Sequence, residues 1–301
     1  MRVKVTKVNE FIAYCKITKN LSDKTIRAYK QDLSAFEKFA KETGDANVMS
    51  YVSRLIETNH KTATIKRHLA TLSQYFKYVY RNDKISNPML QFEFKLKSEK
   101  MLPRTITVRE VKKLLATLYG LRELATTEFA TFQTTRDLAL VDLLCSTGMR
   151  IGEAAAMTVD DVDLRSRIVL IHGKGKKERL IYLSCAETAT NLKQWLVLRK
   201  ELNPSHNFVF VNRQLTPISI HGIEDIFTKY RNLAQINGHA TPHYLRHTFA
   251  TNLLANGSDL RSVQEILGHS NVSITERYTE VTTSRKIKVL KKFNYRNNLL
   301  D

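Results

Sequence analysis

Helical periodicity fades between Arg81 and Pro103, and this break divides the chain into two parts. Asn87 precedes Pro88 inside the break, and a residue before proline is driven away from helical backbone angles. A chain of 301 residues is long enough to form two hydrophobic cores. We therefore expect one domain over residues 1–83, a basic linker over 84–104, and a second domain over 105–301.

The first part has the pattern of four amphipathic helices. Apolar residues recur three or four positions apart, which places them on one face of a helix. Ser22 is a candidate N-cap of the second helix, and Gly44 is a candidate stop at its end. The four stripes are marked by Val8, Phe11 and Ile12; by Ile26, Leu33 and Phe36; by Val48, Tyr51 and Leu55; and by Ile65, Leu69 and Phe76.

Positive charge is concentrated in the same part. The whole chain has a net charge of +19, which indicates a polyanionic partner. Residues 1–104 hold 21 Lys and Arg against 10 Asp and Glu, whereas the remaining 197 residues hold 27 against 19. The distribution predicts a helical clamp on double-stranded DNA, although any one of these cations alone is most often a solvated charge. The candidate contact residues are Lys24, Arg27, Lys61, Lys66 and Arg67.

Cysteine usage and hydropathy exclude several classes of protein. Cys15, Cys145 and Cys185 are isolated, which argues against a disulfide framework and against a zinc site. No apolar run approaches the length of a membrane span, and the N-terminus has no signal-peptide core. We expect a cytoplasmic protein with no membrane partner.

The second part is predicted to be mostly helical with a small antiparallel β-sheet. One helix starts at a capping-box pattern, Thr107 to Glu110, and runs through Leu118; residues 121–135 have no regular pattern, and a further helix is expected from Thr135. Strands are expected at Val159–Leu164, Ile168–His172 and Arg179–Leu183, with a hairpin turn at Gly173-Lys174-Gly175. Beyond them we predict a helix over Ala186–Leu202, a short buried strand over Phe208–Val211 and a helix over Ile220–Ile236.

Polar groups gather on the helix that begins near Pro242. His243, Arg246 and His247 share one face at helical spacing, and the opposite face is apolar. His269 and Tyr278 follow shortly after. Each residue alone is most often a solvated or packing side chain, but together they indicate an anion site with a phenol nearby as a nucleophile.

Two upstream segments contribute further candidates. Arg150 lies at a turn between apolar helices, where we expect it to be buried and oriented by Glu153. Lys174 is expected at the tip of the hairpin. The alternative interpretation is an ordinary basic hairpin, in which Lys176, Lys177 and Arg179 are solvated. A cluster of Asp160, Asp161 and Asp163 is compatible with a metal, but the entry of a surface strand is the better interpretation.

These candidates together resemble the tyrosine recombinase (phage integrase) family, with the nearest likeness to its Xer-type members. Four stretches in the family's order carry the likeness: Thr147–Glu153, Gly173–Arg179, His243–Thr251, and Leu267 through Thr279. The resemblance implies a four-helix core-binding domain followed by a catalytic domain. It implies that Arg150, Arg246 and His269 bind the phosphate, that Tyr278 is the nucleophile and that Lys174 is the general acid. It also implies that His243 accepts a proton or organises the site, and that Glu153 supports the site. It implies no metal and no other cofactor.

The resemblance also implies an assembly, either a homotetramer on a DNA recombination site or a pairing with a second recombinase. The basic segment after Tyr278 carries Ile287, Leu290 and Phe293 at helical spacing, and it is expected to dock on a neighbouring protomer as an exchange helix. A type IB topoisomerase shares the same chemistry and remains an alternative. A DNA-binding accessory protein with a decayed site is a second alternative, and a metal-dependent nuclease using the aspartates is a third.

Overall fold

The computed structural model describes residues 7–44, 46–81, 87–91, 105–173, 178–268 and 279–299. The chain divides into two compact units, Met1–Met101 and Leu102–Asp301, which we call the N-terminal and C-terminal units. Each unit has its own hydrophobic core. Within the described ranges, no helix combines the length and apolarity needed to cross a membrane.

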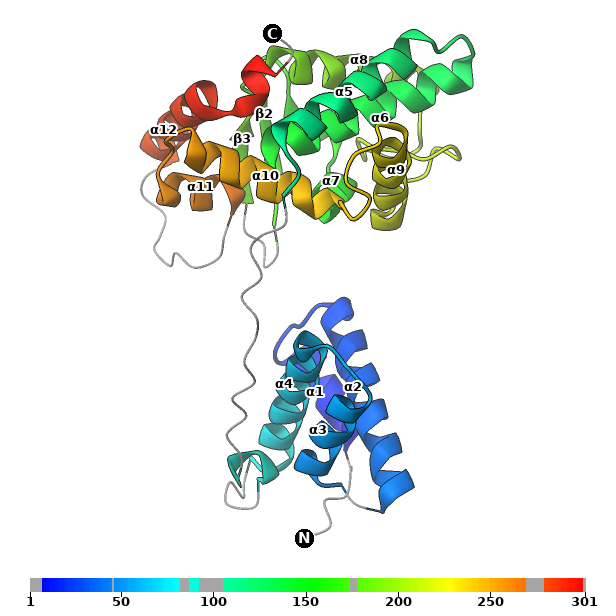
Figure 1. Ribbon diagram of the computed structural model, residues 1–301, viewed down its shortest axis with the longest axis vertical. Helices are drawn as coiled ribbons and strands as arrows, with labels where there is room; N and C mark the ends of the chain where they lie inside the picture. The colour runs from blue at the N-terminus through cyan, green and yellow to red at the C-terminus, as the bar shows by residue number, and fades with distance from the viewer. Residues whose placement is uncertain are drawn as a thin grey trace. The chain divides into compact units, whose positions relative to one another are not determined.

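The N-terminal unit is a bundle of four helices, which confirms the four helices predicted from the apolar periodicity (Figure 1). The side chain of Ser22 accepts a hydrogen bond from the backbone N–H of Thr25 and caps the second helix, and Gly44 ends that helix with φ +66°. Phe11 and Phe36 are completely buried where the helices meet. The elements are α1 Val8–Ile17, α2 Asp23–Thr43, α3 Val48–Glu57 and α4 Thr62–Val79, followed by a 3-10 helix, η1, over Pro88–Gln91.

The C-terminal unit is mostly helical and carries one small antiparallel sheet, as predicted (Figure 1). Its central helix, α6, packs against α5, α8 and α10, and every residue of α6 from Thr134 to Thr147 is buried. Helices α11 and α12 lie together at one end of the unit, and α9 lies at the other (Figure 1). The helices are α5 Val108–Glu123, α6 Glu128–Thr147, α7 Ile151–Ala156, α8 Ala186–Leu202, α9 Ile220–Leu233, α10 Pro242–Ala255, α11 Leu260–Leu267 and α12 Thr279–Phe293; the 3-10 helices are η2 Val159–Asp161 and η3 Tyr295–Asn298.

The sheet has the order β1-β2-β3, with β1 Val162–Asp163, β2 Ile168–His172 and β3 Glu178–Tyr182. In the β2–β3 ladder, His172 is opposite Glu178 and Val169 is opposite Ile181. Val169 and Ile181 are buried, so one face of the ladder covers the core. This ladder confirms the predicted hairpin strands; the expected turn residues from Lys174 on lie outside the described residues.

Residues 121–135, which have no pattern in the sequence, are mostly helical. Helix α5 continues to Glu123, and α6 already begins at Glu128, so the connection is only residues 124–127. The Thr127 side chain accepts a hydrogen bond from the backbone N–H of Ala130 at 3.1 Å and starts α6 seven residues earlier than predicted. The prediction was wrong because a threonine-rich stretch has low helix propensity, and packing against the core overrides it.

Two predicted strands and one helix end also need correction. Val159–Asp161 is a 3-10 turn closed by Asp161, whose Oδ2 accepts the backbone N–H of Thr158 at 2.8 Å, so only Val162–Asp163 remains as strand. Residues 208–211 make isolated bridges to Thr158 and Pro217 in place of a regular strand, although 209–211 are fully buried as expected. Helix α9 ends at Leu233, three residues before the predicted end.

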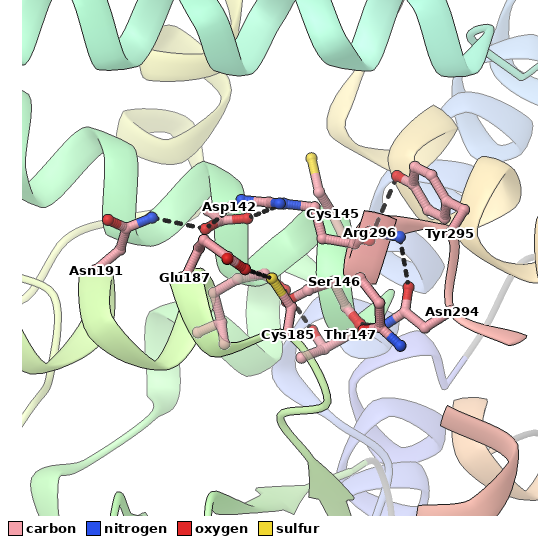
Figure 2. A network of polar contacts seen from close by, with 12 residues as sticks. Asp142, Cys145, Ser146, Thr147, Cys185, Glu187, Asn191, Asn294, Tyr295 and Arg296 are labelled. Carbon is pink, nitrogen blue, oxygen red and sulfur yellow. Dashed lines mark hydrogen bonds and ion pairs between the residues drawn. The ribbon is translucent and has the colours of Figure 1, made fainter. Parts of the chain in front are cut away.

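The C-terminal end of the chain is fastened to α6 by buried polar contacts (Figure 2). Arg296 is completely buried, and its Nε donates to Asp142 Oδ1 at 2.7 Å. Asn294 Nδ2 donates to the carbonyl of Ser146 at 2.9 Å. Leu290 of α12 is 1% exposed and belongs to the core of its own unit. Leu290 and Phe293, two of the three residues expected to dock on a neighbouring protomer, thus pack within their own chain.

Candidate active site

Arg150 follows a tight turn whose backbone conformation requires the glycine two residues before it, Gly148. Gly148 ends α6 with φ +60°, and a Cβ atom built there would come within 2.5 Å of the Phe249 ring. Both the backbone angle and the close approach exclude a larger residue. The turn itself lies against Phe249 of α10 and Leu267 at the end of α11.

Glu153 holds Arg150 at the start of α7. Its Oε2 accepts the backbone N–H of Arg150 at 2.8 Å, and its Oε1 accepts Nη1 of the same residue at 2.8 Å. The predicted contact between the two residues is therefore present. The predicted burial of Arg150 is wrong, because its side chain is 41% exposed while that of Glu153 is 7% exposed. The arginine is at the N-terminal end of the helix, where its Nη1 is bound to Glu153 while much of the side chain remains exposed.

Arg179 of β3 completes the shell around Glu153. Nη1 donates to Glu153 Oε1 at 3.0 Å and Nη2 to Oε2 at 2.7 Å, a two-pronged contact between two buried side chains. Nε donates to the carbonyl of Ile266 at 3.0 Å. The sequence interpretation of Arg179 as a solvent-facing residue is wrong. The available signal was strand alternation, which places Arg179 on the same side as buried Ile181.

Arg246 of α10 joins the same group of residues. Its Nη1 donates to the carbonyl of Gly148 at 2.7 Å, and its Nη2 donates to the carbonyl of Leu267 at 2.7 Å. Arg246 is 8% exposed, whereas His243 and His247, one turn apart on the same helix, are exposed. The arginine thus ties the turn before Arg150 to the last residue of α11.

The charges of these side chains do not cancel. Burial raises the pKa of Glu153, but hydrogen bonds from Arg179 and Arg150 outweigh it and hold the pKa at about 2. Burial, and then the positive charge of Arg150, lower the pKa of Arg246 to about 10, so it stays protonated at neutral pH. Two guanidinium groups bond the Glu153 carboxylate, and that of Arg246 bonds backbone carbonyls beside them, so these four side chains have a net charge of +2 for an anion.

Comparison with known proteins identifies the family of this chain. The family described as "Phage integrase family" matches residues 104–285, and the family described as "Phage integrase, N-terminal SAM-like domain" matches residues 8–83. The chain belongs to the phage integrase family. It is a tyrosine recombinase of the Xer type, as the resemblance predicted.

Individual relatives and solved structures span most of this recombinase. The tyrosine recombinase XerC of Bacillus subtilis is 35% identical over 288 residues, covering 91% of each chain. A crystal structure of the XerH site-specific recombinase bound to a palindromic difH substrate, a post-cleavage complex, has a TM-score of 0.70 at 24% identity and covers 94% of this chain and 81% of that one. A lambda integrase tetramer bound to a Holliday junction has a TM-score of 0.63 at 18% identity, with 90% and 79% covered.

Three predicted catalytic residues of the recombinase, Lys174, His269 and Tyr278, lie outside the described residues. Their described neighbours are Gly173 at the end of β2, Gly268 at the end of α11, and Thr279 at the start of α12. The structure therefore brings together Arg150, Glu153 and Arg246 of the predicted set, adds Arg179, and places His243 on the exposed side of α10.

The three aspartates each serve a local contact. Asp161 Oδ1 pairs with His172 Nε2 at 2.8 Å. Asp163 Oδ1 accepts the backbone N–H of Arg165 at 2.9 Å in the turn before β2. Asp160 Oδ2 accepts Asn207 Nδ2 at 3.2 Å. Across the described part of the chain, no three His, Cys, Asp or Glu side chains converge in a geometry for a metal ion.

The predicted DNA-contact residues differ in their surroundings. Lys24, Arg27, Lys61 and Lys66 are exposed. Arg67 is also exposed, but its Nη1 lies 2.6 Å from Oδ1 of Asp32, a carboxylate that is 1% exposed in the core of the bundle. Arg67 therefore neutralises a buried charge.

Proposed function

We propose that this recombinase cleaves and rejoins DNA at specific sites through a 3′-phosphotyrosyl intermediate formed by Tyr278. One observation carries the proposal: Arg150 and Arg179 share the carboxylate of Glu153, and Arg246 is held beside them by the carbonyls of Gly148 and Leu267. Three guanidinium groups thus gather with one carboxylate, and the side chain of Arg150 is 41% exposed. Attack on a phosphodiester increases negative charge on the nonbridging oxygens, and preorganised guanidinium groups stabilise that charge where it develops.

The proposed chemistry balances without an added cofactor. The oxygen of Tyr278 forms a bond to phosphorus, and the bond from phosphorus to the 5′ oxygen breaks. His243 accepts the phenol proton, and Lys174 donates a proton to the leaving 5′ oxygen. Arg150, Arg246 and His269 bind the nonbridging oxygens. Because the phosphoester linkage is kept in the intermediate, a 5′ hydroxyl can reverse the reaction without ATP or a metal ion.

We propose that the recombinase acts on paired sites as a tetramer, with itself or with a second recombinase. The support is that similar folds occur in a lambda integrase tetramer on a Holliday junction and in a XerH complex with a palindromic substrate. In this proposal the protein is cytoplasmic. Residues 1–83 form a clamp on double-stranded DNA, residues 84–104 form the linker, and residues 105–301 form the catalytic domain with an exchange helix. Lys24, Arg27, Lys61 and Lys66 contact phosphates in the clamp.

The test is a nicked suicide substrate, which loses its 5′ hydroxyl fragment and traps the covalent complex. We expect the wild type to form a covalent protein–DNA product and Tyr278→Phe to form none while it binds DNA normally. Tyr244→Phe, a half-buried tyrosine on α10, is the matched control and keeps the product. A covalent product in Tyr278→Phe contradicts the proposal.

A plasmid assay separates this function from that of a topoisomerase. The recombinase exchanges strands between two sites and does so equally in EDTA. Relaxation of a supercoiled plasmid carrying one site, without exchange on a plasmid carrying two, identifies the type IB topoisomerase reaction. Loss of activity in EDTA points to the metal-dependent nuclease.

A further inference from the structure

Arg179 occupies an inward-facing position of β3, where an apolar residue is usual. In β3 the side chain of Arg179 is 8% exposed, while its apolar neighbour Leu180 is 42% exposed. An arginine turned inward beside an outward leucine requires partners for its charge and its donors, since a buried unpaired charge is strongly unfavourable.

All of its partners belong to the proposed active site. The two terminal nitrogens bind both oxygens of Glu153, and Nε binds the carbonyl of Ile266 in the last turn of α11. The side chain also lies against Gly268, where an added Cβ would come within 3.0 Å of its Cδ and 3.1 Å of its Nη1. Arg179 thus spans from the carboxylate that holds Arg150 to the backbone at the end of α11.

We propose that Arg179 is a positioning residue for strand cleavage, holding Glu153, and through it the guanidinium of Arg150, against the end of α11. This inference rests on the proposed cleavage reaction. With Arg179 in place, Glu153 divides its four hydrogen bonds between two arginines. Without it, the Arg150 guanidinium is the only side-chain partner of a buried carboxylate, and it is drawn toward Glu153 and away from the phosphate. A displacement of about 1 Å costs about a hundredfold in rate.

A role as a DNA-backbone contact predicts a different response. A phosphate contact needs a positive charge at the surface, and lysine supplies it. The arrangement at Arg179 needs three donors in one plane, which lysine cannot present. Arg179→Lys therefore distinguishes the two roles, because it keeps the charge and removes the planar geometry.

The experiment uses the full-length recombinase and single-turnover cleavage of the suicide substrate at saturating DNA. We expect Arg179→Lys and Arg179→Met to lower the rate of covalent product formation by about a hundredfold. The dissociation constant stays within about threefold, and the slope of log K against log salt is unchanged, because the same phosphates are neutralised in each variant. Circular dichroism establishes that each variant is folded at the assay temperature; if Arg179→Met does not fold, Arg179→Lys decides.

Two arginines of the same unit are matched controls. Arg199 is buried as well, and its Nε donates to the carbonyl of Phe208 at 2.7 Å. Arg165 is exposed in the turn before β2. Arg199→Met lowers stability without changing the cleavage rate of the folded protein, and Arg165→Met changes neither.

A double-variant cycle tests the route through Arg150. In an Arg150→Ala background, Arg179→Lys lowers the rate by less than about threefold, since the group that it positions is absent. The inference is overturned if the loss of cleavage rate in the double variant is the product of the losses in the two single variants. A wild-type rate in Arg179→Lys, or a loss of affinity with a reduced salt slope, also overturns it. If the wild type forms no covalent product, the proposed function itself fails; if it does and the Arg179 variants match it, only this inference fails.

Discussion

A single carboxylate sets the charge balance among the arginines. Glu153 accepts four hydrogen bonds, two from Arg150 and two from Arg179, and is almost fully buried. These bonds keep it ionised far below neutral pH, so its negative charge is constant wherever the recombinase works. The remaining positive charge is then also constant, which suits a site for a phosphodiester.

The depressed pKa of Glu153 makes a prediction about stability and pH. Because the folded-state pKa of about 2 lies below the ordinary value of 4.5, its stabilising effect is complete above pH 4.5 and is lost as the pH falls toward 2. We expect the gap in unfolding free energy between wild type and Glu153→Gln to shrink by about 2 kcal/mol between pH 6 and pH 3. Urea denaturation at the two pH values measures it, and a gap independent of pH contradicts it.

At the scale of elements, α12 and η3 act as an anchor for the end of the chain. Leu290 is buried in the core, and Arg296 is enclosed against Asp142 on α6 (Figure 2). Asp142 also accepts Nδ2 of Asn191 at 2.7 Å, so the ion pair is part of a satisfied network. Docking of α12 on a neighbouring protomer, as proposed, requires this anchor to open first.

The ion pair itself is open to a direct test. Arg296→Met leaves Asp142 charged and buried, and we expect it to lower the unfolding free energy by about 3–5 kcal/mol. The pair Asp142→Leu with Arg296→Met loses less than the single variant, because no isolated charge remains. Lys288→Met, an exposed position on α12, stays within about 0.5 kcal/mol of the wild type. Denaturant titration measures all three, and an Arg296→Met protein as stable as the control refutes the anchor.

At the scale of the whole molecule, each unit has a hydrophobic core, but the excess positive charge is concentrated in the first third of the chain. Both units have cores, yet the first 104 residues carry 21 basic against 10 acidic side chains. In the proposed function, the clamp gives affinity without sequence information, whereas the arginines near Glu153 serve the reaction. Binding and cleavage are therefore separable by substitution.

Salt titration of the full-length recombinase tests that separation. Replacing Lys24, Arg27, Lys61 and Lys66 by Gln should reduce the slope of log K against log salt by about 0.9 for each phosphate that is no longer neutralised. Cleavage at saturating DNA should stay near the wild-type rate. Arg67→Gln behaves differently, because it removes the arginine that pairs with the buried carboxylate of Asp32 and so lowers the stability of the N-terminal unit. An unchanged salt slope in the fourfold variant places the phosphate contacts elsewhere.

Local patterns predicted several of the local contacts correctly. The capping box of Thr107 and Glu110 forms as predicted, with Glu110 Oε2 accepting the backbone N–H of Thr107 at 2.8 Å. The helix Ala186–Leu202 has the predicted bounds. The Arg150–Glu153 contact was also predictable, because the two residues are three positions apart.

The sequence by itself determined the mostly helical fold with its small hairpin, the family, and the candidate residues, since periodicity and motif spacing record them directly. Only the tertiary structure decided that Arg179 belongs with Glu153 and that Arg246 reaches the carbonyl of Gly148, 98 positions away. The physical reason is that a buried arginine is specified by its partners. Those partners are backbone carbonyls and a carboxylate from other elements, and the backbone carbonyls among them are the same chemical group at every position in the sequence.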